Sequence, residues 1–238
     1  MNILMYHSIS AGPLPLCVSP EIFKTQMEIL DQLGLRAVST AHIRAHGLND
    51  PGVVVLTFDD GYKDMLTTVA PELEKRGWSA TVFLPSQVLG SQDVKFAPWA
   101  ELLSWSDVEQ LVRAGWEVGS HTLTHPDLTT LSDSDLEKEV AESKDELEQG
   151  LGIEVESFAA PFGRTDERVQ ECIRKHYKLA VTTELNEAKA GHELTALPRL
   201  EMHYFRSPER FEAQMRGRGN LYLSLRRTMR NLRKTIGR

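Results

Sequence analysis

The chain has 238 residues, of which 41% are hydrophobic and 26% charged, and its formal net charge is −7. This composition is typical of a soluble globular protein, and the length suits a single α/β barrel domain. The two cysteines, Cys17 and Cys172, lie far apart, which argues against a disulfide framework or a cysteine-based zinc knuckle and fits a reducing compartment.

The first residues, MNILMYHSIS, contain neither a basic region nor a long apolar stretch, so we expect no signal peptide. No apolar run approaches the roughly 18 residues that a membrane-spanning helix needs. The charge is unevenly distributed, because residues 206–238 carry ten basic and two acidic side chains, a net charge of +8, which leaves −15 for residues 1–205. We therefore expect an acidic body and a basic tail that meets something anionic.

Strand-like and helix-like patterns alternate along the chain. The predicted strands cover residues 2–7, 35–39, 53–58, 79–84, 116–120, 156–163 (a strand that ends in a turn), 179–183 and 197–203. The predicted helices cover residues 19–34, 64–77, 104–115, 132–152, 165–177 and 207–217, with Ser19 and Ser106 as caps and Pro71 as a kink. Seven or eight such units predict an α/β fold, a distorted (β/α) barrel of about seven parallel strands.

Polar side chains follow several of these predicted strands. Asp59 and Asp60 end the apolar run VVVLTF, His121 and His125 follow WEVGS, and His7 follows NILMY. Because parallel strands present their carboxyl ends on one face, we expect these side chains to lie close together. Two histidines four residues apart and one carboxylate make a metal site with an open position for water, and the second carboxylate is available as a general base.

Structural roles are the alternatives for both motifs. Histidine pairs at this spacing also occur by chance on protein surfaces. One carboxylate of the Asp59–Asp60 pair would also serve as the cap of helix 64–77, with Gly61 in the turn. That role accounts for one carboxylate and leaves the second unexplained.

Three motifs resemble those of a known family. TFDDG at 57–61 and HTLTH at 121–125 resemble the first two motifs of the polysaccharide deacetylases, which are carbohydrate esterase family 4 or the NodB-homology group. APFG at 160–163 resembles the third motif, whose usual form is Arg-x-Pro-Tyr. The resemblance covers most of residues 1–205. It implies a distorted (β/α) barrel that hydrolyses N-acetyl groups of amino sugars with a divalent metal, Zn²⁺ in the first place, with Co²⁺ or Ni²⁺ as alternatives.

The resemblance also implies roles for individual residues. Asp59 would be the general base for the attacking water, and the metal ligands would be Asp60, His121 and His125. The acetyl pocket would be lined by the turn formed by Pro161, Phe162 and Gly163, and a backbone N–H near Phe162 would help to bind the oxyanion. An ordinary connection between a strand and a helix is the alternative for this turn.

The sequence departs from the family pattern at two places. Ala159 stands where the third motif has its arginine, so the cation beside the base is missing, and Arg199 is our candidate replacement. The family's last motif, Leu-x-His, supplies a histidine that protonates the leaving amine. We favour His7 for this role over His203, because ILMYHSI resembles the opening strand of circularly permuted members of the family.

Two further segments have predicted contacts. In the loop over residues 95–105, which holds Phe96, Trp99 and Trp105, we expect Trp99 to contact the sugar. Residues 220–236 form a basic amphipathic helix whose apolar stripe is Leu221, Leu225, Met229, Leu232 and Ile236. This stripe would lie on an anionic membrane surface or would dock on the acidic barrel, and we expect no nucleic-acid partner.

The sequence thus predicts a polysaccharide deacetylase domain over residues 1–205 and a basic helical tail over residues 206–238. We expect a metal-dependent deacetylase that acts on an N-acetylated saccharide or glycolipid precursor. We place it in the cytoplasm, in peripheral contact with the inner face of the membrane. The alternatives are a hydrolase of a small non-sugar amide with the same metal centre and a non-catalytic saccharide-binding module.

Overall fold

The structure, a computed structural model, describes residues 1–91, 95 and 97–236. Its strands are β1 (Ile3–Tyr6), β2 (Arg36–Val38), β3 (Val53–Phe58), β4 (Thr81–Leu84), β5 (Glu117–Ser120), β6 (Ser157–Ala159), β7 (Leu179–Leu185) and β8 (Leu197–Glu201). Its α-helices are α1 (Pro20–Gln32), α2 (Ala41–His46), α3 (Ala70–Glu74), α4 (Trp105–Arg113), α5 (Asp133–Leu151), α6 (Glu167–His176), α7 (Pro208–Met215) and α8 (Asn220–Ile236). Short turns include η1 (Met65–Val69), η4 (Pro161–Gly163), η5 (Leu194–Ala196) and η6 (Met202–Phe205).

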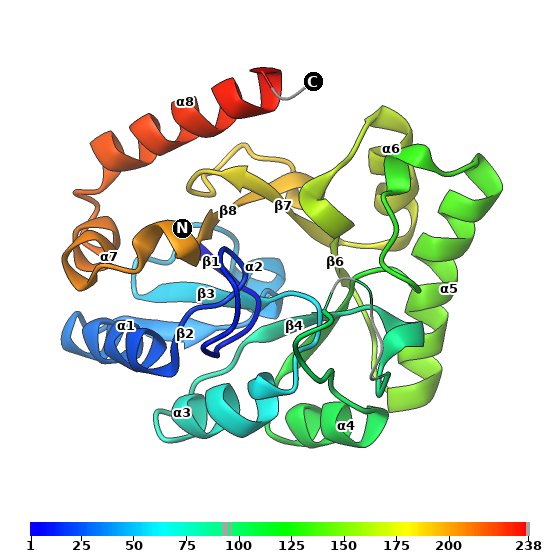
Figure 1. Ribbon diagram of the computed structural model, residues 1–238, viewed down its shortest axis with the longest axis horizontal. Coiled ribbons are helices and arrows are strands. Elements are labelled where there is room, and N and C mark those ends of the chain that lie inside the picture. Colours follow the sequence, from blue (N-terminus) through cyan, green and yellow to red (C-terminus); the bar gives the residue numbers. More distant parts are fainter. Residues whose placement is uncertain (92–94, 96, 237–238) are drawn as a thin grey trace.

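The strands form a closed parallel barrel. Strand β1 pairs with β8 on one side and with β3 on the other, so that seven strands close a ring. Strand β2 lies outside this ring and pairs with the first half of β3, Val53–Val55. Helices surround these strands, as Figure 1 shows. The predicted distorted (β/α) barrel of about seven parallel strands is therefore confirmed.

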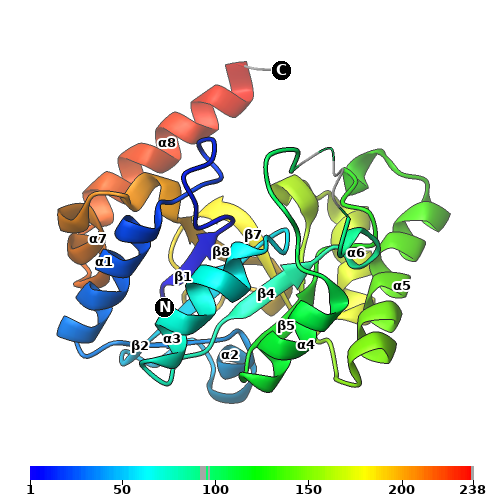
Figure 2. The same cartoon turned by 60° about the horizontal axis from the view of Figure 1, so that its bottom comes forward.

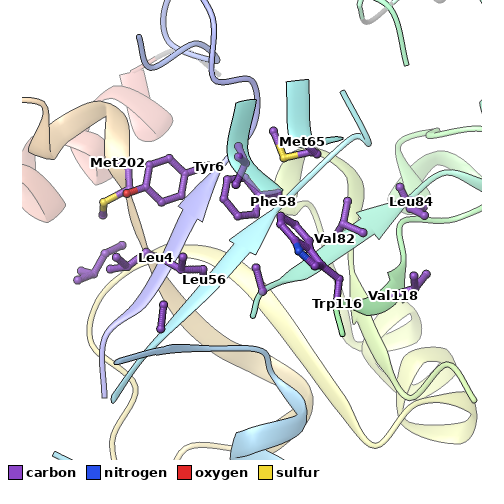
Figure 3. Close-up of a cluster of buried hydrophobic side chains, with 14 of the residues drawn as sticks. Leu4, Tyr6, Leu56, Phe58, Met65, Val82, Leu84, Trp116, Val118 and Met202 are labelled. Atoms are coloured by element: carbon purple, nitrogen blue, oxygen red, sulfur yellow. The ribbon is translucent and has the colours of Figure 1, made fainter. Parts of the chain in front are cut away.

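Strand alternation decides which residues enter the barrel. In β3, Val55 and Thr57 point inward, whereas Leu56 and Phe58 point outward into the apolar layer beneath the helices, where Figure 3 shows them. Since side chains alternate between the two faces of a strand, Asp59 continues the inward series. One of the two carboxylates at the end of this strand therefore points into the mouth of the barrel.

Two local predictions need correction, and one short helix was missed. The predicted helix 64–77 is divided into the π-helical turn η1 and the short helix α3, because Pro71 has no N–H to donate and its ring requires a wider preceding turn. The cap of α4 is Ser104, in a capping box with Asp107, and the prediction of Ser106 is wrong. Helix α2 was not predicted, since six residues carry too little periodicity to reveal a helix.

The C-terminal segment has two helices with different environments. Helix α7 packs against α1 and buries Phe211. Helix α8 is anchored near its start by buried Leu223, and its C-terminal turns extend beyond the barrel in Figure 2. Among the described residues, none of the helices is both long enough and apolar enough to cross a bilayer. The division of the chain at residue 205 stays a prediction.

The predicted apolar stripe of α8 faces away from the body of the protein. The exposed side chains are those of Leu221, Leu225, Met229 and Leu232, and the side chain of Ile236 lies outside the described part. The alternative in which these residues dock on the barrel is therefore wrong for the four described ones. The helix is held instead by Leu223 and by Tyr222, whose hydroxyl donates to the Tyr204 carbonyl at 2.7 Å.

Candidate active site

A cavity of about 840 Å³ opens at the carboxyl ends of the strands. Its size is within the range of pockets that hold small organic ligands. Five of the residues predicted to carry chemistry line it, together with His203; these five are His7, Asp59, Asp60, His121 and His125. The topology therefore brings the predicted residues together from β1, β3, β5 and the turn after β8.

Arg199 binds Asp59 inside the barrel. Its Nη1 and Nη2 atoms each donate to one carboxylate oxygen at 2.7 Å, and both side chains are almost completely buried. Further bonds to Thr57 Oγ1 at 3.1 Å and to the Thr182 carbonyl at 2.9 Å orient the guanidinium group. This bidentate geometry fixes the carboxylate more firmly than a single contact does.

Ala159 and the Phe83 ring beside Arg199 belong to one buried cluster. Ala159 is fully buried in the apolar cluster inside the barrel, which also contains Phe83. The guanidinium carbon of Arg199 lies 5.8 Å from the centre of the Phe83 ring. An arginine from β8 thus reaches Asp59, whereas the family motif places an arginine on the strand that here is β6.

Asp60, His121 and His125 form a second cluster beside this pair. Asp60 Oδ1 lies 3.3 Å from the Nε2 atom of each histidine, and the potential ligand atoms all lie within 4.8 Å of one another. His121 Nδ1 lies 2.6 Å from the Ala159 carbonyl oxygen, so this nitrogen is the donor. The Nε2 lone pair is then directed to the cluster, as in histidines that bind metals.

The donor set of this cluster fits a divalent metal ion. Two imidazole nitrogens and one carboxylate oxygen converge on a single point at the edge of the cavity, which leaves space for water and substrate on the open side. The three residues could therefore hold a catalytic metal.

Burial and neighbouring groups have opposite effects on the pKa of each carboxylate. Burial raises the pKa of Asp59, but the charge and hydrogen bonds of Arg199 outweigh it and lower the pKa below the ordinary value. Burial likewise opposes ionisation of Asp60, and the adjacent imidazole rings of His121 and His125 hold its pKa well below the usual range. Both carboxylates are therefore ionised near neutral pH.

The backbone is strained at the site. Four non-glycine residues of the described chain have positive φ, and all four lie in the site motifs: Asp60 (74°), Thr122 (73°), His125 (64°) and Phe162 (59°). This conformation is unfavourable for residues with a Cβ atom and persists where the surrounding structure enforces it. The strain is concentrated where the side chains must be aimed at one point.

The turn η4 lines the cavity in part. Phe162 is exposed and contacts the His125 ring edge-on, with 4.8 Å between the centroids. Gly163 also lines the cavity, and a Cβ atom there would lie 2.0 Å from Thr183 Oγ1, so no larger residue fits. Pro161 is buried beneath the turn and is absent from the cavity lining.

His7 and His203 have different surroundings. Strands β1 and β3 pair with Tyr6 opposite Phe58, so His7 and Asp59 follow at neighbouring strand ends, and both line the cavity. His203 is influenced instead by Glu201, Arg206 and Arg226, and burial lowers its pKa.

Trp99 lies outside the cavity lining. Its ring stacks on Tyr62, with 6.1 Å between the centroids. Phe96 falls outside the described residues. The substrate contact predicted for Trp99 stays a prediction.

The sequence reasoning missed the opposite wall of the cavity. This wall contains two tyrosines and four arginines: Tyr204, Arg206, Arg210, Tyr222, Arg226 and Arg230. The spacing of Tyr222, Arg226 and Arg230, at i, i+4 and i+8, puts these three on one face of α8. The same helix also has an apolar stripe, so the sequence pattern alone does not identify which face lines the cavity.

Comparison with known proteins gives consistent matches. A family model for polysaccharide deacetylases matches residues 46–180. The Bacillus subtilis protein named "Putative polysaccharide deacetylase YxkH" is 28% identical over 85% of this chain and 71% of its own length. The structure of the Streptococcus pyogenes deacetylase PplD, in complex with acetate, superposes with a TM-score of 0.76 at 28% identity and covers 88% of this chain and 95% of its own.

A relative with a named sugar substrate is more distant. The peptidoglycan-N-acetylglucosamine deacetylase of Bacillus cereus is 24% identical over 66% of this chain, which spans 54% of that protein. Because the family model matches more than half of the chain and the barrel agrees with a solved deacetylase, the chain belongs to the polysaccharide deacetylase family.

Proposed function

We propose that this chain is a metal-dependent deacetylase that hydrolyses the N-acetyl group of an amino sugar in a polysaccharide, an oligosaccharide or a glycolipid precursor. The observation that carries the proposal is the placement of the Asp59–Arg199 pair beside Asp60, His121 and His125 at the mouth of the barrel. One of the relatives named above is a peptidoglycan-N-acetylglucosamine deacetylase. A divalent metal, Zn²⁺ in the first place, would supply Lewis-acid activation of the acetamide carbonyl and of the attacking water.

Asp59 is the proposed general base. Its ionised carboxylate accepts a proton from the water as the water oxygen bonds to the acetyl carbon. Arg199 is a positioning residue, because it keeps Asp59 ionised and fixes its orientation through two hydrogen bonds. Breakage of the C–N bond then releases acetate.

His7 is the proposed donor of the proton that the leaving amine requires. It lines the cavity together with Asp59 and Asp60, and it follows β1, which pairs with the strand that ends at Phe58. His203 lies beside the opposite wall of the cavity, and the charged groups that influence it are those of Glu201, Arg206 and Arg226. His7 therefore remains our choice over His203.

We further propose that α8 brings the enzyme to the inner face of an anionic membrane. The support is the row of exposed apolar side chains on this helix, together with the net charge of +8 over residues 206–238. The double variant Leu221→Gln/Leu225→Gln should lose sedimentation with phosphatidylglycerol vesicles. Leu194→Gln, which changes an exposed leucine on η5, should retain it. Equal sedimentation of both variants would contradict the proposal.

The enzymatic proposal is tested by acetate release from a panel of N-acetylated saccharides and glycolipids, with simple non-sugar acetamides as a second panel. We expect acetate and a free amine in equal amounts from at least one N-acetylhexosamine compound. Acetate from the non-sugar amides alone would assign a small-amide hydrolase. Metal-loaded protein that binds saccharides without acetate release would assign a binding module.

A further inference from the structure

The cavity has two chemically different walls. One carries the carboxylates and histidines described above, and the other carries Arg206, Arg210, Arg226 and Arg230. The arginines come from the end of η6, from α7 and from α8, so three separate segments deliver guanidinium groups to one surface. Hydrolysis of an acetamide uses none of them, because the base, its partner and the metal ligands all lie on the other wall.

Tyrosine rings hold two of these arginines in place. The guanidinium carbon of Arg226 lies 5.3 Å from the Tyr204 ring centre and 5.5 Å from that of Tyr222, and its Nε donates to the Tyr222 hydroxyl at 3.1 Å. The guanidinium carbon of Arg210 lies 5.0 Å from the Tyr222 ring centre. These contacts fix the position of the guanidinium groups without neutralising their charge.

The positive charge of the wall is mostly uncompensated. Arg230 pairs with Glu201 at 3.4 Å, and no other of the four arginines has a carboxylate partner among the described residues. The Nε atom of Arg206 is buried and has no hydrogen-bond acceptor in the described part of the chain. Burial of an unpaired donor is costly, and an acceptor brought by a ligand or by water would satisfy it.

We propose that this wall binds a phosphate or diphosphate group that the substrate carries next to its N-acetylated sugar. The inference rests on the proposed deacetylase function, because it defines the substrate class of that same cavity. Four guanidinium groups with one carboxylate leave a net charge of +3, which suits the about −1.5 to −2 charge of a phosphate monoester or the larger charge of a diphosphate. Arginine forks match phosphate oxygens in geometry, and a neutral glycan gains little from them.

The first test compares turnover of N-acetylglucosamine 1-phosphate with that of the neutral methyl glycoside of N-acetylglucosamine. We expect the wild type to prefer the phosphorylated sugar in kcat/KM. Arg226→Gln should reduce this kcat/KM by roughly tenfold to a hundredfold, in line with loss of a charge-assisted hydrogen bond, and should change the neutral substrate less than about threefold. Arg216→Gln is the matched control, since this exposed arginine lies outside the cavity lining, and it should have no effect on either substrate.

The second test is independent of catalysis. Glucose 1-phosphate has no acetamide, so its binding to metal-stripped wild-type protein is measured by calorimetry, with glucose as the neutral control. We expect binding of the phosphate compound only, a loss of affinity in Arg206→Gln and Arg226→Gln, and weakening with added salt. Removal of the metal excludes phosphate binding at the cluster of Asp60, His121 and His125.

The outcomes separate the two proposals. Acetate release with equal kcat/KM for both substrates, and equal loss in Arg226→Gln, would overturn the phosphate site and leave the deacetylase standing. Arginine-dependent binding of glucose 1-phosphate without acetate release from any sugar would support the phosphate site and overturn the deacetylase. A third arm presents the same sugar phosphate linked to a lipid in phosphatidylcholine vesicles. Faster arginine-dependent turnover there than in solution would identify a lipid-linked headgroup as the source of the phosphate.

Discussion

The two ends of the barrel each hold an arginine–carboxylate pair, with different consequences. At the amino end, Glu117 at the start of β5 receives hydrogen bonds from Arg44 and from the hydroxyl groups of Thr40, Thr81 and Ser157. At the carboxyl end, Asp59 receives hydrogen bonds from Arg199 alone among the described side chains. Charge lowers the pKa of both carboxylates against the effect of burial.

The difference lies in what surrounds each pair. Both carboxylate oxygens of Glu117 accept hydrogen bonds from neighbouring side chains. Arg44 Nε also donates to Glu156 at 3.0 Å, so the polar groups at this end bind one another. The pair at the carboxyl end borders a cavity, three potential ligand atoms of the proposed metal site and four backbone positions with positive φ. The amino end therefore stabilises the barrel, while the carboxyl end holds reactive groups on a strained backbone beside a cavity.

Loss of the metal site should have the largest effect on activity. Asp60→Ala removes the carboxylate shared by His121 and His125, and we expect bound divalent metal to fall to background in dialysed protein. Acetate release should fall by at least about 10³-fold, because Lewis-acid activation contributes several kcal/mol. Metal analysis and the acetate assay check both results, and full activity in metal-depleted Asp60→Ala would contradict the proposed role.

The amino-end pair should matter for stability and hardly for chemistry. Arg44→Met leaves the partly exposed Glu117 carboxylate without its cation, so we expect a loss of up to about 3 kcal/mol in the free energy of unfolding, the lower end of the range for buried pairs. Denaturant titration measures this loss. The kcat of the folded fraction should stay close to that of the wild type. A large fall in kcat would contradict a purely stabilising role for the amino-end pair.

Arg199 should control the pH dependence of the reaction. In Arg199→Ala, burial acts on Asp59 without the opposing cation, so the pKa of Asp59 rises and the base is deprotonated only at higher pH. The acidic limb of the kcat/KM profile should therefore move upward by roughly 1–3 pH units. The double variant Arg199→Ala/Ala159→Arg, which restores the family's arrangement, should return the limb toward its original position. An unshifted limb in the single variant would show that Asp59 is not the group that titrates.

The smallest expected effect is the difference between alanine substitutions at two glycines with positive φ. Gly163 (φ 62°) has Thr183 Oγ1 2.0 Å from its ideal Cβ position, whereas Gly152 (φ 67°) after α5 has open space. Gly152→Ala should cost about 1–2 kcal/mol for the left-handed conformation alone. Gly163→Ala should cost more in thermal unfolding and should also lower kcat/KM, because the turn beside His125 must move. Identical effects of the two changes would contradict a special role for this turn.

The sequence predicted the barrel because its signals are local and repeated. Short apolar runs separated by amphipathic helices require a parallel architecture, and polar residues at strand ends then converge. The boundaries were less accurate where backbone detail decides them, as at Pro71, Ser104 and the six-residue helix α2. These depend on hydrogen bonds that a pattern of residue types does not specify.

The site was predictable in part for the same reason. Asp59, Asp60, His121 and His125 lie in compact motifs, and their convergence follows from the topology. The contact between Arg199 and Asp59 joins residues 140 positions apart, so one sequence could suggest it only as a candidate. The arginine wall was missed because α8 has two plausible faces. Which face turns inward depends on the tertiary contacts of Tyr222 and Leu223.

The most direct test of the account is a comparison of wild type and Asp59→Asn at equal, measured occupancy of the metal. Both proteins are given the N-acetylated sugar that the wild type turns over best, and acetate release is followed per metal ion. The account predicts equal metal content and a loss of roughly 10²–10⁴-fold in kcat for Asp59→Asn, the range of a positioned general base. Equal kcat in the two proteins would contradict it, because Asp59 would then have no part in the reaction.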